Sequence, residues 1–281
     1  FRIVNGAALA QAKRTLKEAH GVSSLLARPE SNPKLAKGMK QGVMSAPLHL
    51  APADLSGFEV CPMATNGCRK ACLHTAGNPA HMAGKQKARV ARTQLYFKQR
   101  ELFMSVLIVE IAALVRKAEK AGMLPAIRLN ATSDITWERV RFTHNGKQYA
   151  NLMEYFPEVQ FYDYTKRSNR KGIPSNYHVT FSLAEGNDTQ AIEALNNGLN
   201  VAVVFNVKRG QPLPDNFSIY RPSGAGLNTL VIDGDETDFR PSDPRGVIVG
   251  LRAKGDAIGD TSGFVRAAEP KPCGLALRYG G

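Results

Sequence analysis

The stretch HVTFSLAEGNDTQAIEALNNGLNVAVVF, residues 178–205, contains a complete strand–helix–strand unit. Residues 178–182 and 201–205 are short runs rich in β-branched and aromatic side chains without proline, as buried parallel strands are. Between them, residues 189–197 have the composition of a helix, and Gly198 follows as a typical helix stop. Such a unit indicates an α/β fold.

The same alternation continues on both sides of this unit. Five further strand candidates have a similar composition: 44–50, 126–130, 159–164, 229–233 and 247–251. Residues 81–122 are predicted to form a long helix with an apolar stripe, ended by Gly122. With these strands and helices we expect a (β/α) barrel, partial rather than closed, and an open wound sheet is the alternative.

The first 42 residues differ from the rest of the chain. They are basic and punctuated by proline and glycine, with a short basic helix predicted over residues 13–20. We therefore expect an N-terminal basic arm over residues 1–42, followed by a single α/β barrel domain over residues 43–281.

The chain is strongly basic, with 37 Lys and Arg against 24 Asp and Glu and a formal net charge of +13. Such an excess favours nucleic acid or a phosphorylated or otherwise anionic ligand as partner, and a solvated basic surface is the alternative. No apolar run reaches the roughly 20 residues that cross a bilayer, so no membrane is expected. Few cysteines and no export signal indicate a reducing cytoplasm.

Polar residues follow several of the predicted strands at the point where each strand ends. In α/β folds ligands bind at the carboxyl ends of the strands, so we expect these side chains to share one pocket. The pocket would hold a small or phosphorylated ligand. Its candidate residues are Arg128, Asn130, Ser133, Asp134, Asp163, Lys166 and Ser182.

Three of the four cysteines lie in FEVCPMATNGCRKACLHTAGNP, residues 58–79, and the fourth lies near the end of the chain. Structural zinc sites usually begin with two cysteines separated by two residues, and this stretch has spacings of six and three. An iron–sulfur cluster tolerates wider spacings because its thiolates bind different irons. We therefore predict a 4Fe–4S cluster, with zinc and incidental buried cysteines as alternatives. The predicted ligands are Cys61, Cys68, Cys72 and Cys273.

The cysteine stretch follows the first predicted strand and precedes the long helix. This layout resembles the radical S-adenosylmethionine barrel, although the spacing of the cysteines differs from the usual motif of those enzymes. S-adenosylmethionine needs an open coordination site on one iron. It is therefore expected as a cofactor only if one iron, the one assigned to Cys273, is not bound by the protein.

Two further charged segments are candidate sites. The start of the long helix is rich in cations without acids, so Lys85, Arg89 and Arg92 are candidate anion-binding residues, against a solvated basic face. The run VIDGDETDFRPSDP, residues 231–244, carries five carboxylates. Its spacing does not match a calcium loop, so a surface turn paired with Arg240 and Arg245 is expected.

Several blocks of the sequence also resemble a known family. They are CPMATNGCRKACLHTAGNP, KARVARTQLYF, IRLNATSDITWE, FYDYTKR, NYHVTFSLAEGND and VIVGLRAKGDAIGDTSGFV. Between Cys61 and Cys273 the chain is similar to a family of phage-encoded proteins called gene product 88. The resemblance implies a bacteriophage gene expressed in the cytoplasm of the host cell, and it implies no particular reaction.

These observations predict a phage-encoded iron–sulfur protein that binds one 4Fe–4S cluster on a scaffold like that of the radical S-adenosylmethionine enzymes. The first alternative is a radical or redox enzyme with an open iron. The second is a nucleic-acid-binding protein with a structural cluster or zinc ion, whose binding weakens steeply with salt. An electron carrier is the third class. Whether the protein is an enzyme, and its oligomeric state, are left open by the sequence.

Overall fold

The computed structural model describes residues 6–31, 33–75 and 82–268. Its centre is one large sheet in which seven strands run parallel along the order β1–β2–β5–β6–β7–β10–β9. The bounds of these strands are β1 Val43–Pro47, β2 Leu124–Arg128, β5 Gln160–Thr165, β6 Tyr177–Ser182, β7 Val201–Phe205, β10 Ile248–Arg252 and β9 Gly226–Asp233. The predicted α/β class is confirmed, and all seven predicted strands are present.

Two short strands extend this sheet. β8 (Asn216–Tyr220) pairs antiparallel with β9 at the outer edge, and β11 (Val265–Arg266) pairs parallel with β7. A separate hairpin, β3 (Phe142–His144) with β4 (Lys147–Tyr149), lies outside the sheet. The strand order is an open path from β1 to β8, and within the described residues no pairing joins these two ends into a closed barrel.

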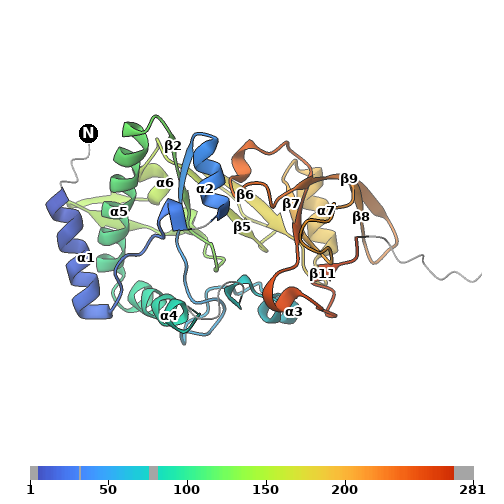
Figure 1. Ribbon diagram of the computed structural model, residues 1–281, viewed down its shortest axis with the longest axis horizontal. Coiled ribbons are helices and arrows are strands. Elements are labelled where there is room, and N and C mark those ends of the chain that lie inside the picture. Colours follow the sequence, from blue (N-terminus) through green and yellow to red (C-terminus); the bar gives the residue numbers. More distant parts are fainter. Residues whose placement is uncertain (1–5, 32, 76–81, 269–281) are drawn as a thin grey trace, which may run out of the picture.

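Helices cover the outer face of the sheet (Figure 1). α5 (Arg100–Lys120) packs against β1 and β2, and α7 (Asp188–Asn196) packs against β6 and β7. The remaining helices are α1 (Gly6–His20), α2 (Pro33–Lys40), α3 (Asn66–Lys70), α4 (Met82–Lys98) and α6 (Leu152–Tyr155). Single turns of 3-10 helix lie at η1 Pro29–Ser31, η2 Leu73–Thr75, η4 Trp137–Arg139, η5 Arg240–Ser242 and η6 Gly255–Ala257.

The alternation of side chains along the strands builds two parts of the core. Phe103 and Ile111 of α5 pack with Ile127 and Phe161 under the first half of the sheet. Under the second half, Ile192 of α7 belongs to a separate cluster with Phe181, Val201, Val203 and Phe205. Each strand therefore turns one apolar row toward the helices and leaves the other row for the opposite face.

The long helix predicted over residues 81–122 is two helices. The chain leaves helical geometry at Gln99, where φ is −139° and ψ is 58°, and α5 begins at the next residue. No proline or glycine marks this point, so the sequence pattern runs through it. The break lets the mostly polar α4 and the mostly buried α5 take different directions, and both are visible at one side of Figure 1.

The N-terminal segment packs on the sheet domain. Leu16 of α1 and Leu25 are fully buried in the main hydrophobic cluster, and α1 contacts α5. The backbone amides of Leu25 and Leu26 donate to the carboxylate of Glu110 at 3.1 and 2.7 Å. The division of the chain at residue 42 into an arm and a domain stays a prediction.

The inner face of the sheet is partly covered by the segment that follows β9. Phe239 of this segment packs edge-on against Tyr162, with ring centroids 5.6 Å apart, and both belong to a buried cluster with Val43 and Ala126. The segment thus returns from the β9 end of the sheet to β1, β2 and β5. This return places its carboxylates beside the carboxyl ends of the parallel strands.

Candidate functional site

A pocket of about 210 Å³ lies at the carboxyl ends of the parallel strands. One part of its wall comes from the strand ends and the turns after them, namely Arg128, Asn130, Ala131, Thr132, Ser133, Asp134, Tyr164, Thr165, Lys166, Ser182, Ala202, Val204, Leu251 and Arg252. The other part comes from segments that fold over these ends, namely Lys34, Cys61, Ala64, Cys68, Ala71, Cys72, Leu73, Asp235, Asp238, Lys254, Ala257 and Phe264. Six of the seven predicted pocket residues line it, and Asp163 does not.

Asn130 and Asp163 form a buried network that holds the turn after β2. The Asn130 side-chain oxygen accepts from the Ser133 hydroxyl at 2.8 Å and from the Trp137 indole N–H at 3.1 Å. The Asp163 carboxyl accepts from the Asn130 backbone amide at 2.6 Å and from the Tyr177 hydroxyl at 2.7 Å. Burial raises the pKa of Asp163 to about 7. These polar groups already form hydrogen bonds with one another. Their role is therefore to fix the shape of the pocket.

Asp134 has a similar positioning role. Its carboxylate accepts from the Thr165 hydroxyl at 2.6 Å and from the backbone amide of Lys166 at 2.9 Å. It thereby ties the turn after β2 to the turn after β5. This contact fixes the backbone from which the Lys166 side chain enters the pocket.

The Lys166 ammonium group lies between polar and apolar parts of the wall. It donates to the Ser182 hydroxyl at 3.0 Å and lies 5.4 Å from the centre of the Phe264 ring. Among the described residues, no carboxylate forms an ion pair with it. The other four cationic side chains that line the pocket are all ion-paired.

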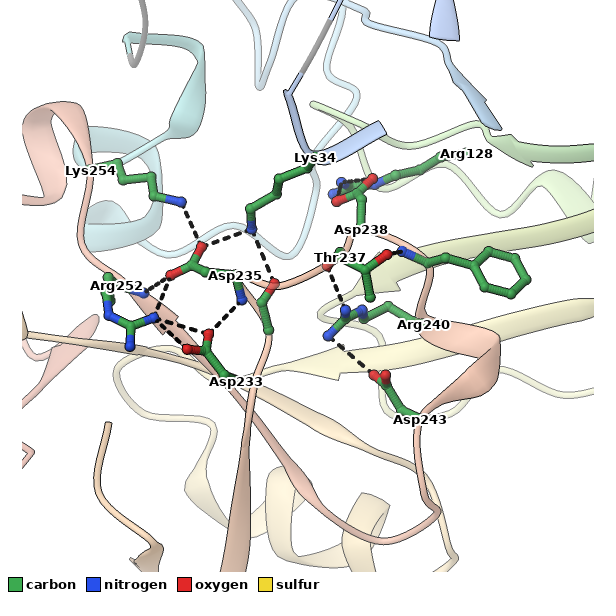
Figure 2. Close-up of polar contacts among 12 residues, drawn as sticks. Lys34, Arg128, Asp233, Asp235, Thr237, Asp238, Arg240, Asp243, Arg252 and Lys254 are labelled. Atoms are coloured by element: carbon green, nitrogen blue, oxygen red, sulfur yellow. Dashed lines mark hydrogen bonds and ion pairs between the residues drawn. The ribbon is translucent and has the colours of Figure 1, made fainter. Parts of the chain in front are cut away.

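Those four cations form the charged side of the pocket with the segment after β9 (Figure 2). Asp235 lies among Lys34, Arg252 and Lys254, at 2.8, 3.2 and 2.6 Å. The hydrogen bonds of Lys254 and Lys34, together with the charge of Lys34, hold the pKa of Asp235 well below its usual range against the opposing effect of burial.

A second ion pair joins this segment to the sheet. Arg128 at the end of β2 binds both carboxylate oxygens of Asp238, at 2.9 and 3.1 Å, and the Tyr162 hydroxyl donates to the same carboxylate at 3.2 Å. The guanidinium of Arg128 also lies 4.7 Å from the centre of the Tyr164 ring. Arg128 is therefore held by Asp238.

The prediction for the acidic run was right about pairing with Arg240, but among the described residues no ion pair involves Arg245, and the predicted position was wrong. Arg240 pairs with Asp243 at 3.1 Å, as expected, but the Arg240 side chain is 1% exposed and does not lie in a surface turn. The sequence did not single out Lys34, Arg252 or Lys254. The run of carboxylates indicates that cationic side chains lie nearby. It does not show that one of them is Lys34, which precedes Gly234 by 200 positions.

The predicted 4Fe–4S cluster is wrong, and so is the zinc alternative. Within residues 6–31, 33–75 and 82–268 no three Cys, His, Asp or Glu side chains are arranged to hold a metal ion. Cys61, Cys68 and Cys72 all line the pocket as free thiols, and Cys273 lies outside the described residues. S-adenosylmethionine was expected to bind only at that cluster, so its prediction as a cofactor is wrong as well.

The surroundings of the three thiols differ from those of metal-bound cysteines. Cys61 packs on the main hydrophobic cluster and its thiol donates to the Thr132 carbonyl at 3.8 Å, whereas Cys68 packs on a separate cluster. Burial raises the pKa of Cys61 to about 12 and also raises the pKa of Cys72. Cys61 and Cys72 are therefore protonated, partly buried thiols, which behave as small apolar side chains.

The glycine in the cysteine stretch has a packing role. The backbone amide of Gly67 donates to the Glu185 carboxylate at 2.6 Å, and a Cβ at Gly67 would lie 2.0 Å from the Ser262 hydroxyl oxygen. Figure 1 shows α3 beside the segment that follows β10. This close approach sets α3, with Cys68, against the mouth of the pocket.

The candidate anion-binding residues of the long helix lie outside the pocket. Arg89 is buried and donates to the His74 carbonyl at 3.1 Å, and Arg92 donates to the Ser24 carbonyl at 2.9 Å. Lys85 is exposed. The two arginines therefore hold neighbouring segments, and an anion site at this helix stays a prediction.

Comparison with known proteins gives one match. A family model described as gene product 88 matches residues 24–268. No curated protein and no solved structure matches the chain, so the layout expected of a radical S-adenosylmethionine barrel has no neighbour that supports it. Among the described helices, none is long and apolar enough to span a membrane.

Proposed function

The chain belongs to the gene product 88 family, and on this premise we propose that it binds a small anionic ligand in the pocket at the carboxyl ends of β2, β5 and β6. The family description states no activity, so the proposal depends on the site itself. Within the pocket, Lys166 is the residue that would contact the anion, with Ser182 as its neighbour.

The proposal depends on one observation, that Lys166 forms no ion pair with any described residue. A lysine between a hydroxyl group and an aromatic ring, without a carboxylate partner among the described residues, has donor capacity left for an anion. Hydrogen bonds to a charged partner contribute about 1.5–3 kcal/mol, more than those between neutral groups. Five cationic side chains and three carboxylates line the pocket, which also favours a negative ligand.

The proposal predicts that Lys166→Met weakens binding of organic phosphates by at least about tenfold, because a charge-assisted hydrogen bond is lost. Ribose 5-phosphate and phenyl phosphate serve as probes, and isothermal titration calorimetry measures their dissociation constants. Lys120→Met, at an exposed position on α5 remote from the pocket lining, is the matched control and should bind like the wild type. Equal binding by the Lys166 variant and the wild type would refute the proposal.

The net charge of +13 supports a wider role for anions. It would raise the local concentration of an anionic ligand around the protein, and it also makes nucleic acid a second candidate partner. The two are separable by salt, since binding to many phosphates falls steeply between about 50 and 200 mM salt. Binding of a single small phosphate should depend on salt much more weakly.

The source and the finer architecture are proposals as well. We propose that the gene is carried by a bacteriophage and that the protein acts in the cytoplasm of the host cell. We also propose that the open sheet is an incomplete (β/α) barrel, because its parallel strands follow one another in space nearly in chain order. A relation to the radical S-adenosylmethionine barrel would then concern the scaffold alone.

A further inference from the structure

One wall of the pocket is apolar and built from alanine, cysteine, valine and phenylalanine side chains. Ala71, Ala257 and Phe264 are at most 8% exposed and form one cluster, with Cys68 and Val204 packed against it. All five line the pocket. They come from α3 and its end, η6, β7 and the residue before β11, so the wall is assembled from four separate parts of the chain.

The mouth of the pocket continues this apolar character. Leu73, in η2, lines the pocket and is 51% exposed, and Ala257, in η6, lines it as well. Their two short helices, η2 and η6, contact each other, and the Asp256 amide donates to the Thr75 hydroxyl at 3.4 Å. An apolar ligand group that covers the Leu73 side chain would remove it from water, which is favourable.

Lys166 stands at the boundary of this wall. Its ammonium group lies 5.4 Å from the Phe264 ring centre on the apolar side and 3.0 Å from the Ser182 hydroxyl on the polar side. An anionic head bound at Lys166 would therefore direct the rest of the ligand along the apolar wall toward Leu73. A ligand with a hydroxylated body would leave its polar groups without partners there, which costs free energy.

From this arrangement we propose that the ligand is a small organic phosphate monoester with an apolar body. The inference rests on the anion-binding function proposed above and specifies the part of the ligand that does not carry the charge. Binding ligands mainly through apolar walls, with a few polar groups that fix their orientation, is usual for small-molecule pockets. The pocket of about 210 Å³ has room for a body of roughly the size of one aromatic ring.

The test compares two probes that share a phosphate head and differ in the body. Phenyl phosphate should bind the full chain at least about tenfold more tightly than ribose 5-phosphate. The free energy gained by burying an aromatic ring corresponds to a larger change in affinity than this. Calorimetry measures both dissociation constants. Leu73→Ser and Val204→Thr should each weaken binding of phenyl phosphate more than binding of ribose 5-phosphate, so that the preference falls at least threefold.

Leu55→Ser is the matched control, since Leu55 is 53% exposed and does not line the pocket, and it should keep the preference. Thr at position 204 has nearly the shape of Val, which keeps the strand intact. If ribose 5-phosphate binds as tightly as phenyl phosphate and both depend on Lys166, the apolar-body inference is wrong and the anion site stands. If neither probe binds, both proposals fail.

Discussion

Asp163 shows how a single buried residue links this fold to pH. Its carboxyl group is fully buried and accepts hydrogen bonds from Asn130 and Tyr177, and burial raises its pKa to about 7. In an unfolded chain the pKa is near ~3.9. Between about pH 4 and pH 7 the native state therefore holds a proton that the unfolded state has released. The stabilisation of the native state by this group is complete below about pH 4 and is lost as the pH rises through 7.

Asp163→Asn tests this linkage, because an amide keeps an acceptor for the Asn130 backbone and cannot titrate. Between pH 4 and pH 8, the free energy of unfolding of the wild type should fall relative to that of the variant by a few kcal/mol. Urea denaturation of the wild type and the variant across this range measures the difference. The contributions of the other titrating groups cancel, because both proteins contain them. Asp215→Asn, at an exposed position, is the control. A difference that is constant with pH would contradict the prediction.

At this scale the sequence identified positions better than roles. Polar residues after strand ends were predicted to line one pocket, and Arg128, Asn130, Asp134 and Lys166 do so. Their roles depend on partners that the sequence does not reveal, such as Asp238, which is 110 positions from Arg128. The cysteine prediction failed for the same reason, because spacing does not show that Cys61 and Cys68 pack on different clusters.

At the scale of elements, helix α3 depends on the absence of a side chain at Gly67. A Cβ there would lie 2.0 Å from the Ser262 hydroxyl oxygen and 2.8 Å from a Glu185 carboxylate oxygen. Relief of these contacts would disturb the hydrogen bonds of Ser262 to Asp260 and of Glu185 to the Gly67 amide. The helix would move away from the pocket mouth.

Gly67→Ala is therefore expected to reduce the free energy of unfolding by about 1–3 kcal/mol, as overpacking does. Gly84→Ala is a control within another helix, α4, where a Cβ meets no atom within 4 Å, and it should be neutral or stabilising by up to about 1 kcal/mol. Thermal or urea unfolding of both variants measures the contrast. Equal stability of the two variants would show that α3 does not need the close approach.

Elements with strong apolar patterns were predicted well, and elements held by tertiary contacts were not. All seven parallel strands and α7 were found within a few residues of their bounds. The break at Gln99 lies between two good helix sequences and has no local signal. The edge strand β8 alternates polar and apolar residues without a buried run, and β11 is only two residues long, so neither could be seen.

At the scale of the whole molecule, side chains connect the β1–β2 side of the open sheet with the segment that follows β9. Lys34, on α2 beside β1, donates to the Gly234 carbonyl at 3.1 Å and pairs with Asp235 beyond β9 (Figure 2). Asp238 connects the same segment to Arg128 on β2, and the two paired side chains are 15% and 14% exposed. Such buried pairs are costly to break because the remaining partner is left without its counter-ion.

Asp238→Asn should therefore reduce the free energy of unfolding by about 3 kcal/mol, since Arg128 would remain as a buried cation. Glu30→Gln is the matched control, because it removes the exposed pair of Glu30 with Lys117 and should cost less than about 1 kcal/mol. Urea denaturation measures both. A loss no larger than that of the control would mean that the Arg128–Asp238 pair does not hold the segment in place.

The class of the whole fold followed from the alternation of strands and helices, but the way in which the sheet ends did not. A parallel sheet with strands in chain order can close into a ring or remain open, and the same apolar pattern serves both. In this structure the segment of residues 234–243 lies on the inner face, where Phe239 packs against Tyr162 and Asp238 accepts from the Tyr162 hydroxyl. Nothing in its sequence marks it as a segment that enters the interior.

The ion pairs of the segment after β9 have a consequence for how substitutions can act on this fold. A barrel closed by backbone hydrogen bonds keeps its diameter whatever residues it carries, because the peptide groups are common to every sequence. Here the join is made by side chains at positions 34, 128, 235 and 238. A substitution at one of these positions would therefore change this connection and leave the backbone hydrogen bonds of the strands as they are.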